Sequence, residues 1–217
     1  MLREYFTQDI FTSLILVCLL LLVIARQLFP NRFRDFIAVI YNLKFLKLYV
    51  RERKKFDIFN ALLFANFIFM AGVFCFLAVK NLSIQTLELY TTLVFFIFVL
   101  TAIFLIKSIF ERVVGHFFEF SEFVKTYLFY KNTFKYITGL VLLFINTLLL
   151  FSSLEKKYTI YVAFGLIFLI NLNGFIRFLR LYQKAIIHNF FYFLLYLCAL
   201  EIGPYVILYK VFKDYFG

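Results

Sequence analysis

Long apolar runs, separated by short polar or basic segments, dominate the sequence. Most of them approach the roughly 20 residues that a helix needs to cross about 30 Å of hydrocarbon. Transmembrane β-barrel strands would instead alternate apolar and polar residues over about 10 positions, a pattern that these runs lack. The sequence therefore predicts an all-α, polytopic helical membrane protein with six transmembrane helices, at Ile10–Phe29, Ile58–Val79, Leu89–Phe110, Tyr136–Phe151, Tyr158–Phe178 and Phe190–Val211.

The composition supports the same class. Of 217 residues, 65% are hydrophobic, with 35 Phe, 15 Tyr and no Trp, which exceeds the apolar share of soluble domains. No linker rich in Pro, Gly or Ser divides the chain, so we expect a single integral membrane domain over residues 1–217. The first apolar run is expected to be retained as a span, because its positive charges mostly follow the run rather than precede it as in a signal peptide.

Positive charge alternates between the connections. Most of the 23 Lys and Arg fall between spans one and two, three and four, and five and six. By the positive-inside rule these connections are cytoplasmic, which predicts that both termini lie outside. The formal net charge of +11 is then explained by topology and by contact with anionic lipid headgroups, and nucleic acid is not expected as a partner.

The first cytoplasmic connection, residues 31–56, repeats basic residues at helical spacing. These are Lys44, Lys47, Arg51, Lys54 and Lys55. Together with the interleaved apolar residues they predict an interfacial helix whose basic stripe faces lipid phosphates. A docking face for a cytosolic partner is the alternative.

The second cytoplasmic connection, residues 111–136, places His116, Glu119 and Glu122 three positions apart. On one helix these side chains share a face and form a weak candidate for a metal site. A solvated polar face is the favoured interpretation, so we expect no metal and no cofactor. Cys18, Cys75 and Cys198 all fall inside spans and form no disulfide framework or CxxC motif, which is typical of packing residues.

Polar residues interrupt the apolar runs near their middles. Counted from the predicted span ends, Glu201, Asn146 and Asn171 lie about midway across the membrane, which predicts a midplane polar cluster. A charged group there costs on the order of 3 kcal/mol, so Glu201 should face protein. Gly203 and Pro204 should kink the sixth helix. We expect Glu201 to be protonated and hydrogen-bonded to another helix as a clasp, and a proton or ion role stays open.

Four stretches of the sequence resemble a known family. YFLLYLCALEIGPYVILYK, residues 192–210, with RFLRLY at 177–182 shortly upstream, resembles the C-terminal signature of an uncharacterised family of multi-pass proteins, a domain of unknown function, found in Bacteroidota. FEFSEF at 118–123 and GLVLLFINTLLL at 139–150 resemble that family's central hairpin. The resemblance implies a bacterial inner membrane and a cell-envelope setting. It supplies no reaction.

Three classes of function remain. The favoured one is a non-enzymatic scaffold or accessory subunit of a cell-envelope complex, such as a secretion or motility assembly, with other membrane subunits or further copies of itself as partners. A proton- or ion-coupled transporter or channel component using Glu201 is the alternative. A membrane enzyme acting on lipid near His116 and Glu119 is a second alternative, less favoured because no Walker loop, HExxH, GxSxG or kinase motif is present.

The topology generates the first prediction. In a chain without its native cysteines, a Lys54→Cys variant should not react with a membrane-impermeant thiol reagent in intact cells and should react after permeabilisation, because this connection is predicted to be cytoplasmic. A Lys156→Cys variant, in a connection predicted to face out, is the matched control and should react in intact cells. Labelling of Lys54→Cys in intact cells would invert the topology.

Overall fold

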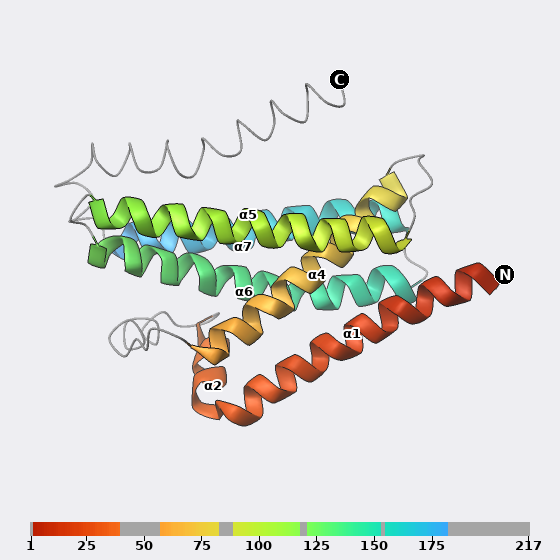
Figure 1. Cartoon of the computed structure of the whole chain (residues 1–217), viewed down its shortest axis with the longest axis horizontal. Coiled ribbons are helices and arrows are strands. Elements are labelled where there is room, and N and C mark those ends of the chain that lie inside the picture. The colour runs from red at the N-terminus through yellow and green to blue at the C-terminus, as the bar shows by residue number, and fades with distance from the viewer. Residues whose placement is uncertain (1, 40–56, 83–88, 118–120, 153–154, 182–217) are drawn as a thin grey trace, which may run out of the picture.

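The computed structural model describes residues 2–39, 57–82, 89–117, 121–152 and 155–181. Within these ranges the chain is all-α. Its helices are α1 (Leu2–Leu28), α2 (Pro30–Ala38), α4 (Ile58–Leu82), α5 (Leu89–Phe117), α6 (Ser121–Phe151) and α7 (Lys156–Leu181). Figure 1 shows the long helices running back and forth along one bundle.

Among the described helices, 5 are long and apolar enough to cross a membrane: Asp9–Leu28, Ile58–Leu82, Tyr90–Phe110, Tyr127–Phe151 and Lys156–Arg177. They agree with the predicted spans one, two, three and five. The predicted fourth span begins at Tyr136, whereas the apolar part of the described helix begins at Tyr127. The sixth, Phe190–Val211, lies outside the described residues.

The fourth span begins early because its lysines do not interrupt the helix. The Lys131 ammonium lies 5.4 Å from the centre of the Tyr127 ring, and that of Lys135 lies 4.7 Å from the centre of the Phe104 ring. Such contacts let long side chains cover apolar surface while their charged ends stay near a polar boundary. The helix therefore continues through a stretch that hydropathy alone assigns to a connection.

The chain turns sharply between α1 and α2 at Phe29 and Pro30. Phe29 has φ −134° and ψ 61°, outside the helical region, and Pro30 takes the first position of α2. A proline disfavours helical geometry in the residue before it, yet suits the first turn of a helix, whose N–H groups have no intrahelical acceptor. This dipeptide ends the first span and redirects the chain into a short amphipathic helix.

One end of the bundle collects most of the described basic residues, and we call it the basic end. Here α1, α5 and α7 end, α4 and α6 begin, and α2 lies alongside (Figure 1). Arg26, Arg32, Arg34, Lys107, Lys131, Lys135, Arg177 and Arg180 belong to these parts of the helices, against Lys80, Lys156 and Lys157 at the opposite end. The described structure therefore gathers the charge that the sequence distributes over separate connections.

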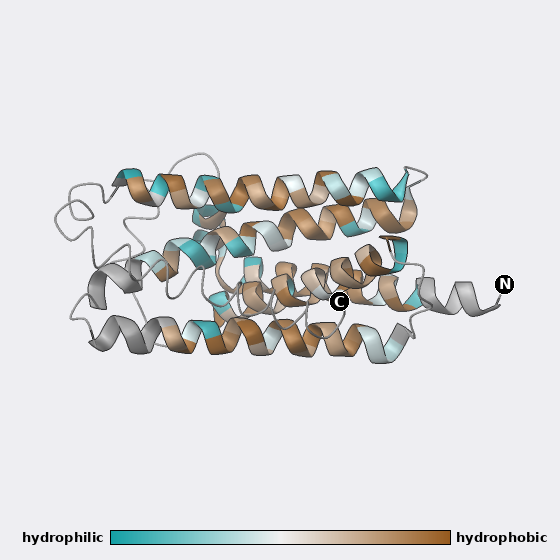
Figure 2. Cartoon of the chain, turned by 90° about the horizontal axis from the view of Figure 1, so that it is seen from above, coloured by the Kyte–Doolittle hydropathy of each residue, from teal (hydrophilic) through white to brown (hydrophobic). Residues whose placement is uncertain are grey.

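Helix α4 is the centre of the bundle. In the apolar 18-residue stretch of its span 67% of the residues are buried, compared with 6% in that of α5. Aromatic contacts attach it to three neighbours: Phe11 of α1 lies 5.5 Å from Phe76, Phe104 of α5 lies 5.2 Å from Phe67, and Phe164 of α7 lies 5.2 Å from Phe74, measured between ring centres. The described long helices are hydrophobic along most of their length (Figure 2), and large hydrophobic side chains such as Leu20, Phe98 and Phe168 are exposed, as expected for helices that face lipid.

At Gly139 the backbone of α6 comes close to that of α4. A β-carbon added to this residue would lie 2.9 Å from the Cα of Phe67, a backbone atom that cannot move without shifting the helix. Small residues at such crossings let two helix backbones approach closely. This close packing matters in a membrane, because the hydrophobic effect does not drive helices together in lipid.

We predict that Gly139→Ala destabilises the bundle by about 1–3 kcal/mol, because the added methyl overpacks this crossing. The change should lower the thermal unfolding midpoint of the purified protein in detergent. Phe144→Ala, on the same helix at a side chain that is 64% exposed, is the control and should leave the midpoint nearly unchanged. An unaltered midpoint for Gly139→Ala would show that α4 and α6 do not approach as described.

Candidate functional site

Asn146 joins α6 to α4 inside the bundle. Its side chain is fully buried, and its Nδ2 donates a hydrogen bond to the carbonyl oxygen of Met70 at 2.9 Å. The Met70 sulfur lies 3.7 Å from the same nitrogen. A helix carbonyl already accepts a hydrogen bond within its own helix, so Asn146 donates to the second lone pair of the Met70 carbonyl oxygen. The contact adds a directional link to the packing of these two helices.

Asn171 belongs to a different part of the bundle. Its Nδ2 donates to the carbonyl oxygen of Ile167 at 2.8 Å and to the Thr138 hydroxyl of α6 at 3.3 Å. Thr138 precedes Asn146 by eight positions, which is about 12 Å along a helix. Asn146 and Asn171 therefore contact α4 and α6 at separate places, and Glu201, the third member of the expected midplane cluster, lies outside the described residues.

Unused hydrogen-bonding capacity lies between α4 and its neighbours. Asn66 of α4 is fully buried, and neither its Nδ2 nor its Oδ1 has a partner among the described residues; the Oδ1 of Asn146 is in the same state. An amide without a partner costs roughly 2–7 kcal/mol to transfer from water to an apolar environment. These two amides are thus the strongest described sites in the interior for binding a further polar group.

Several predicted site residues lie outside the described residues. These are Glu201, Gly203, Pro204, Lys44, Lys47, Arg51, Lys54, Lys55 and Glu119. His116 belongs to α5 and Glu122 to α6, so they do not share the single helix that their spacing assumed. Within the described residues no group of three or more His, Cys, Asp or Glu could hold a metal ion.

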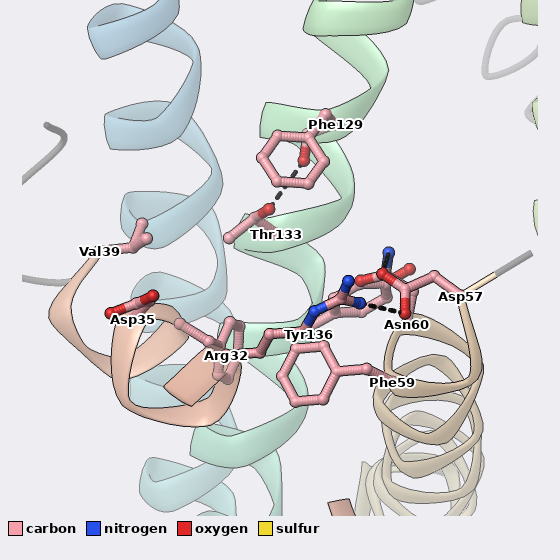
Figure 3. Close-up of a pocket in the computed structure, with 10 residues that line it drawn as sticks. Arg32, Asp35, Val39, Asp57, Phe59, Asn60, Phe129, Thr133 and Tyr136 are labelled. Carbon is pink, nitrogen blue, oxygen red and sulfur yellow. Dashed lines mark hydrogen bonds and ion pairs between the residues drawn. The ribbon is translucent and has the colours of Figure 1, made fainter. Parts of the chain in front are cut away.

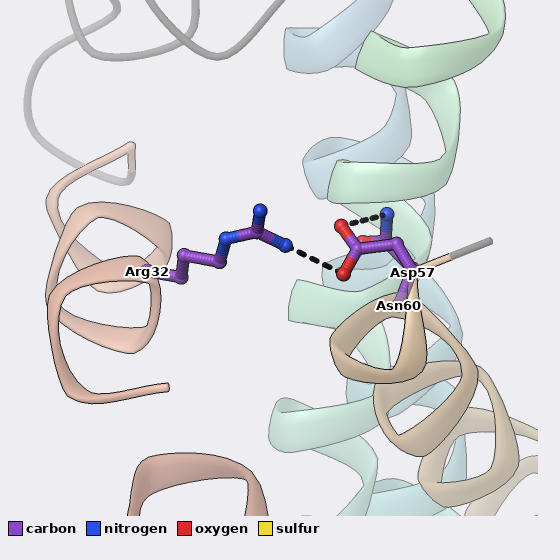
Figure 4. Close-up of polar contacts among 3 residues, drawn as sticks. All are labelled: Arg32, Asp57 and Asn60. Atoms are coloured by element: carbon purple, nitrogen blue, oxygen red, sulfur yellow. Dashed lines mark hydrogen bonds and ion pairs between the residues drawn. The ribbon is translucent and has the colours of Figure 1, made fainter. Parts of the chain in front are cut away.

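An ion pair at the basic end fastens α2 to α4. The Arg32 guanidinium of α2 contacts the Asp57 carboxylate at 2.5 Å, and Asn60 donates its Nδ2 to the other carboxylate oxygen at 3.2 Å (Figure 4). Asp57 directly precedes α4, where the positive end of the helix dipole favours a carboxylate. The side chains of Arg32 and Asp57 are 24% and 22% exposed, so solvent screens the pair only in part. We call Arg32, Asp57 and Asn60 the Arg32 cluster.

The Arg32 cluster borders a small cavity between α2, α4 and α6 (Figure 3). Its volume is about 40 Å³, which is room for one or a few water molecules rather than for a substrate. Besides the cluster it is lined by Asp35, Phe36, Val39, Phe59, Phe129, Thr133 and Tyr136. Carboxylates, an arginine and a hydroxyl thus share one cavity with aromatic rings, where the basic end meets the apolar core.

Sequence reasoning missed the Arg32 cluster. Arg32 counted only as one of many basic residues, and Asp57 received no role. The available signal was the position of Asp57 immediately before an apolar run, which is typical of a helix start. Nothing in the sequence pairs it with Arg32, because 25 residues separate the two.

The Arg32 cluster generates a prediction. Arg32→Gln and Asp57→Asn should each lower the thermal unfolding midpoint in detergent, and the double variant should lose less than the sum, with a coupling free energy of about 1–2 kcal/mol. Arg34→Gln, at an exposed arginine on the same short helix, is the control and should show no coupling to Asp57→Asn. Additive losses for Arg32→Gln and Asp57→Asn would mean that the ion pair does not fasten α2.

Comparisons with known proteins place the chain in a family without an assigned reaction. No curated protein and no solved structure matches it. A family model described as "Domain of unknown function (DUF4271)" matches residues 11–212. The match includes the stretches at 118–123, 139–150 and 192–210, so the resemblance to an uncharacterised family is confirmed. Since it covers nearly the whole chain, this protein belongs to the DUF4271 family.

Proposed function

We propose that this protein is a non-enzymatic scaffold or accessory subunit of a cell-envelope complex, embedded in a bacterial inner membrane. Secretion and motility assemblies are the complexes that suit such a subunit. The distribution of packing carries the proposal: the described interior is filled by large side chains, while extensive aromatic surface points outward. Such a molecule is suited to bind other proteins on its outer surface rather than to conduct ions or substrates through its centre.

The filled interior is centred on α4. Phe67, Met70, Val73 and Phe76 are all buried, and neighbouring helices place further aromatic rings against them. Close-packed rings exclude water, which a hydrated route for ions or substrates would require. The cavity beside the Arg32 cluster lies at the basic end and not in the middle of α4.

The outer surface carries exposed aromatic residues along both α5 and α7. Tyr90, Phe95 and Phe98 are 68%, 60% and 71% exposed. Lipid can cover this surface, and so can a helix of another subunit, because van der Waals packing of large and small side chains drives helix association in membranes. Aromatic side chains are also prominent among residues that dominate protein interfaces.

The basic end supplies the orientation that we propose for the protein. Cationic residues at this end favour a cytoplasmic location under the positive-inside rule and an attraction to anionic lipids. The Arg32 cluster fixes α2 there, next to the connection in which the sequence predicts a basic interfacial helix. With an even number of spans, both termini would then lie outside the cytoplasm.

A second candidate is a proton- or ion-coupled component. The observation that favours it is the pair of buried amides, Asn66 and Asn146, whose unpartnered atoms could bind water or an ion within the span. Polar groups at membrane depth often mark such routes.

The scaffold proposal predicts a site-specific contact with another protein. A photoreactive amino acid at Phe98 should give one discrete cross-linked product with another envelope protein in the membranes of the native host, because this side chain points out of the bundle. The same amino acid at Phe76, which is 1% exposed, is the control and should give no such product.

The scaffold proposal also predicts that a Glu201→Gln chain fully restores function to a deletion strain, since an amide keeps hydrogen bonds but cannot release a proton.

The opposite pattern supports the second candidate. Purified protein in sealed vesicles would then carry a proton or ion flux, and Glu201→Gln would abolish both the flux and the rescue while the protein remained folded. Cross-linking from Phe98 to lipid alone, together with such a flux, would overturn the scaffold proposal.

A further inference from the structure

Three lysines lie inside apolar spans near the basic end. Lys107 belongs to the span Tyr90–Phe110 of α5, and Lys131 and Lys135 belong to the span Tyr127–Phe151 of α6. A cation within a span is costly unless an anion or the headgroup region stabilises it. We call these three residues the inner lysines, and their shared position requires a source of negative charge.

The inner lysines lie on the facing sides of α5 and α6, which pack side by side and run in opposite directions (Figure 1). The ammonium of Lys135 lies 4.7 Å from the centre of the Phe104 ring of α5. Lys107 follows Phe104 by three residues, and Lys131 precedes Lys135 by four. Residues three or four apart share one side of a helix, so Lys107 and Lys131 both lie one turn nearer the basic end than this contact.

The direction of α6 lets its lysines extend toward the membrane surface. Side chains of a helix tilt toward its N-terminus, and α6 begins at the basic end. Lys107 is three residues from the end of its own span and is 9% exposed. Long lysine side chains in such places direct their charged ends to the headgroups. Lys107 and Lys131 thus lie next to the headgroup region, with Lys135 one turn deeper.

The described spans offer the inner lysines no carboxylate. Asp9 is the only acidic residue in the five described spans, and it lies at the opposite end of the bundle. Asp35 and Asp57 line the cavity of the Arg32 cluster, which adjoins another side of α6. Beyond the span of α5, Glu111 is followed at once by Arg112, so these two residues add no net charge. The space between α5 and α6 therefore has a positive potential that attracts an anion.

We propose that the inner lysines bind the phosphate of an anionic phospholipid between α5 and α6. Ammonium groups donate charge-assisted hydrogen bonds to phosphate oxygens, and basic sites between membrane helices on the cytoplasmic side bind anionic headgroups. Phe110, one turn from Lys107 and 59% exposed, offers the acyl chains an apolar surface. A headgroup with two phosphates should bind more tightly than one with a single phosphate, because three cations face it.

This lipid site goes beyond the proposed scaffold role and does not depend on it, since a transporter with the same helices would present the same lysines. It also differs from the basic stripe that the sequence predicts at residues 44–55. That stripe would lie on the membrane surface, whereas the inner lysines belong to two spans and hold a headgroup between two helices.

Native mass spectrometry of the full chain in detergent tests the proposal. Phosphatidylglycerol, cardiolipin and phosphatidylethanolamine with the same acyl chains are added in turn, and the bound fraction is measured at each concentration. Cardiolipin should bind most tightly, then phosphatidylglycerol, and zwitterionic phosphatidylethanolamine least. Lys107→Gln, Lys131→Gln and Lys135→Gln should each weaken phosphatidylglycerol binding about fivefold, and Lys131→Arg, which keeps the charge, should not.

Two variants are matched controls for charge alone. Arg34→Gln removes an exposed cation at the basic end, and Lys157→Gln removes one at the opposite end; both should bind phosphatidylglycerol as the unchanged chain does. The thermal unfolding midpoint of each variant in lipid-free detergent shows that it is folded. Should Lys107→Gln, at a buried position, fail to fold, the half-buried Lys131 and Lys135 variants carry the test.

Three outcomes would overturn the proposal. Equal binding of phosphatidylglycerol and phosphatidylethanolamine would mean that the site does not select an anionic headgroup. A loss in Arg34→Gln as large as in the lysine variants would mean that the basic end attracts lipid diffusely. Displacement of phosphatidylglycerol by inorganic phosphate at an equal concentration would mean that the inner lysines bind free phosphate rather than a lipid.

Discussion

The close approach of α4 and α6 is the contact on which the rest of the described bundle depends. In lipid no hydrophobic drive holds helices together, so their association relies on packing and on a few hydrogen bonds. Gly139 removes the side chain that would keep α6 away from the Phe67 backbone, and Asn146 then reaches the Met70 carbonyl. With α6 in place, α4 can present its other faces to α1 and α5, and α7 can pack on α6.

At the basic end the same two helices meet a different environment. There the packing gives way to the Arg32 cluster and its small cavity, and lysines of α6 lie over aromatic rings. Each of these contacts pairs a charge with a carboxylate or a π-system where the span ends. The bundle is thus apolar and tightly packed along most of its length, and electrostatic contacts fix its basic end.

Hydropathy predicted the all-α membrane architecture, but it did not predict which side chains meet inside the bundle. Spans one, two, three and five agree with the helices because each is a continuous apolar run. The predicted fourth span is shorter than the helix because Lys131 and Lys135 resemble a polar connection in the sequence. In the structure their aliphatic stems cover apolar surface and the helix continues through them. The contact of Asn146 with Met70 and the pairing of Arg32 with Asp57 join residues far apart in sequence, and no local pattern encodes them.

The Arg32 cluster also defines a closed loop. Arg32 and Asp57 hold together the two ends of the segment between them. Phe36 and Val39, at its start, are buried in the core, so a change of length after Val39 acts on the bundle mainly through the entropy of closing the loop. This entropy changes slowly with length, since doubling a flexible loop costs only about 0.6 kcal/mol. Relatives could therefore lengthen or replace this part of the chain, and acquire new recognition elements at the membrane surface, without rebuilding the helices beneath.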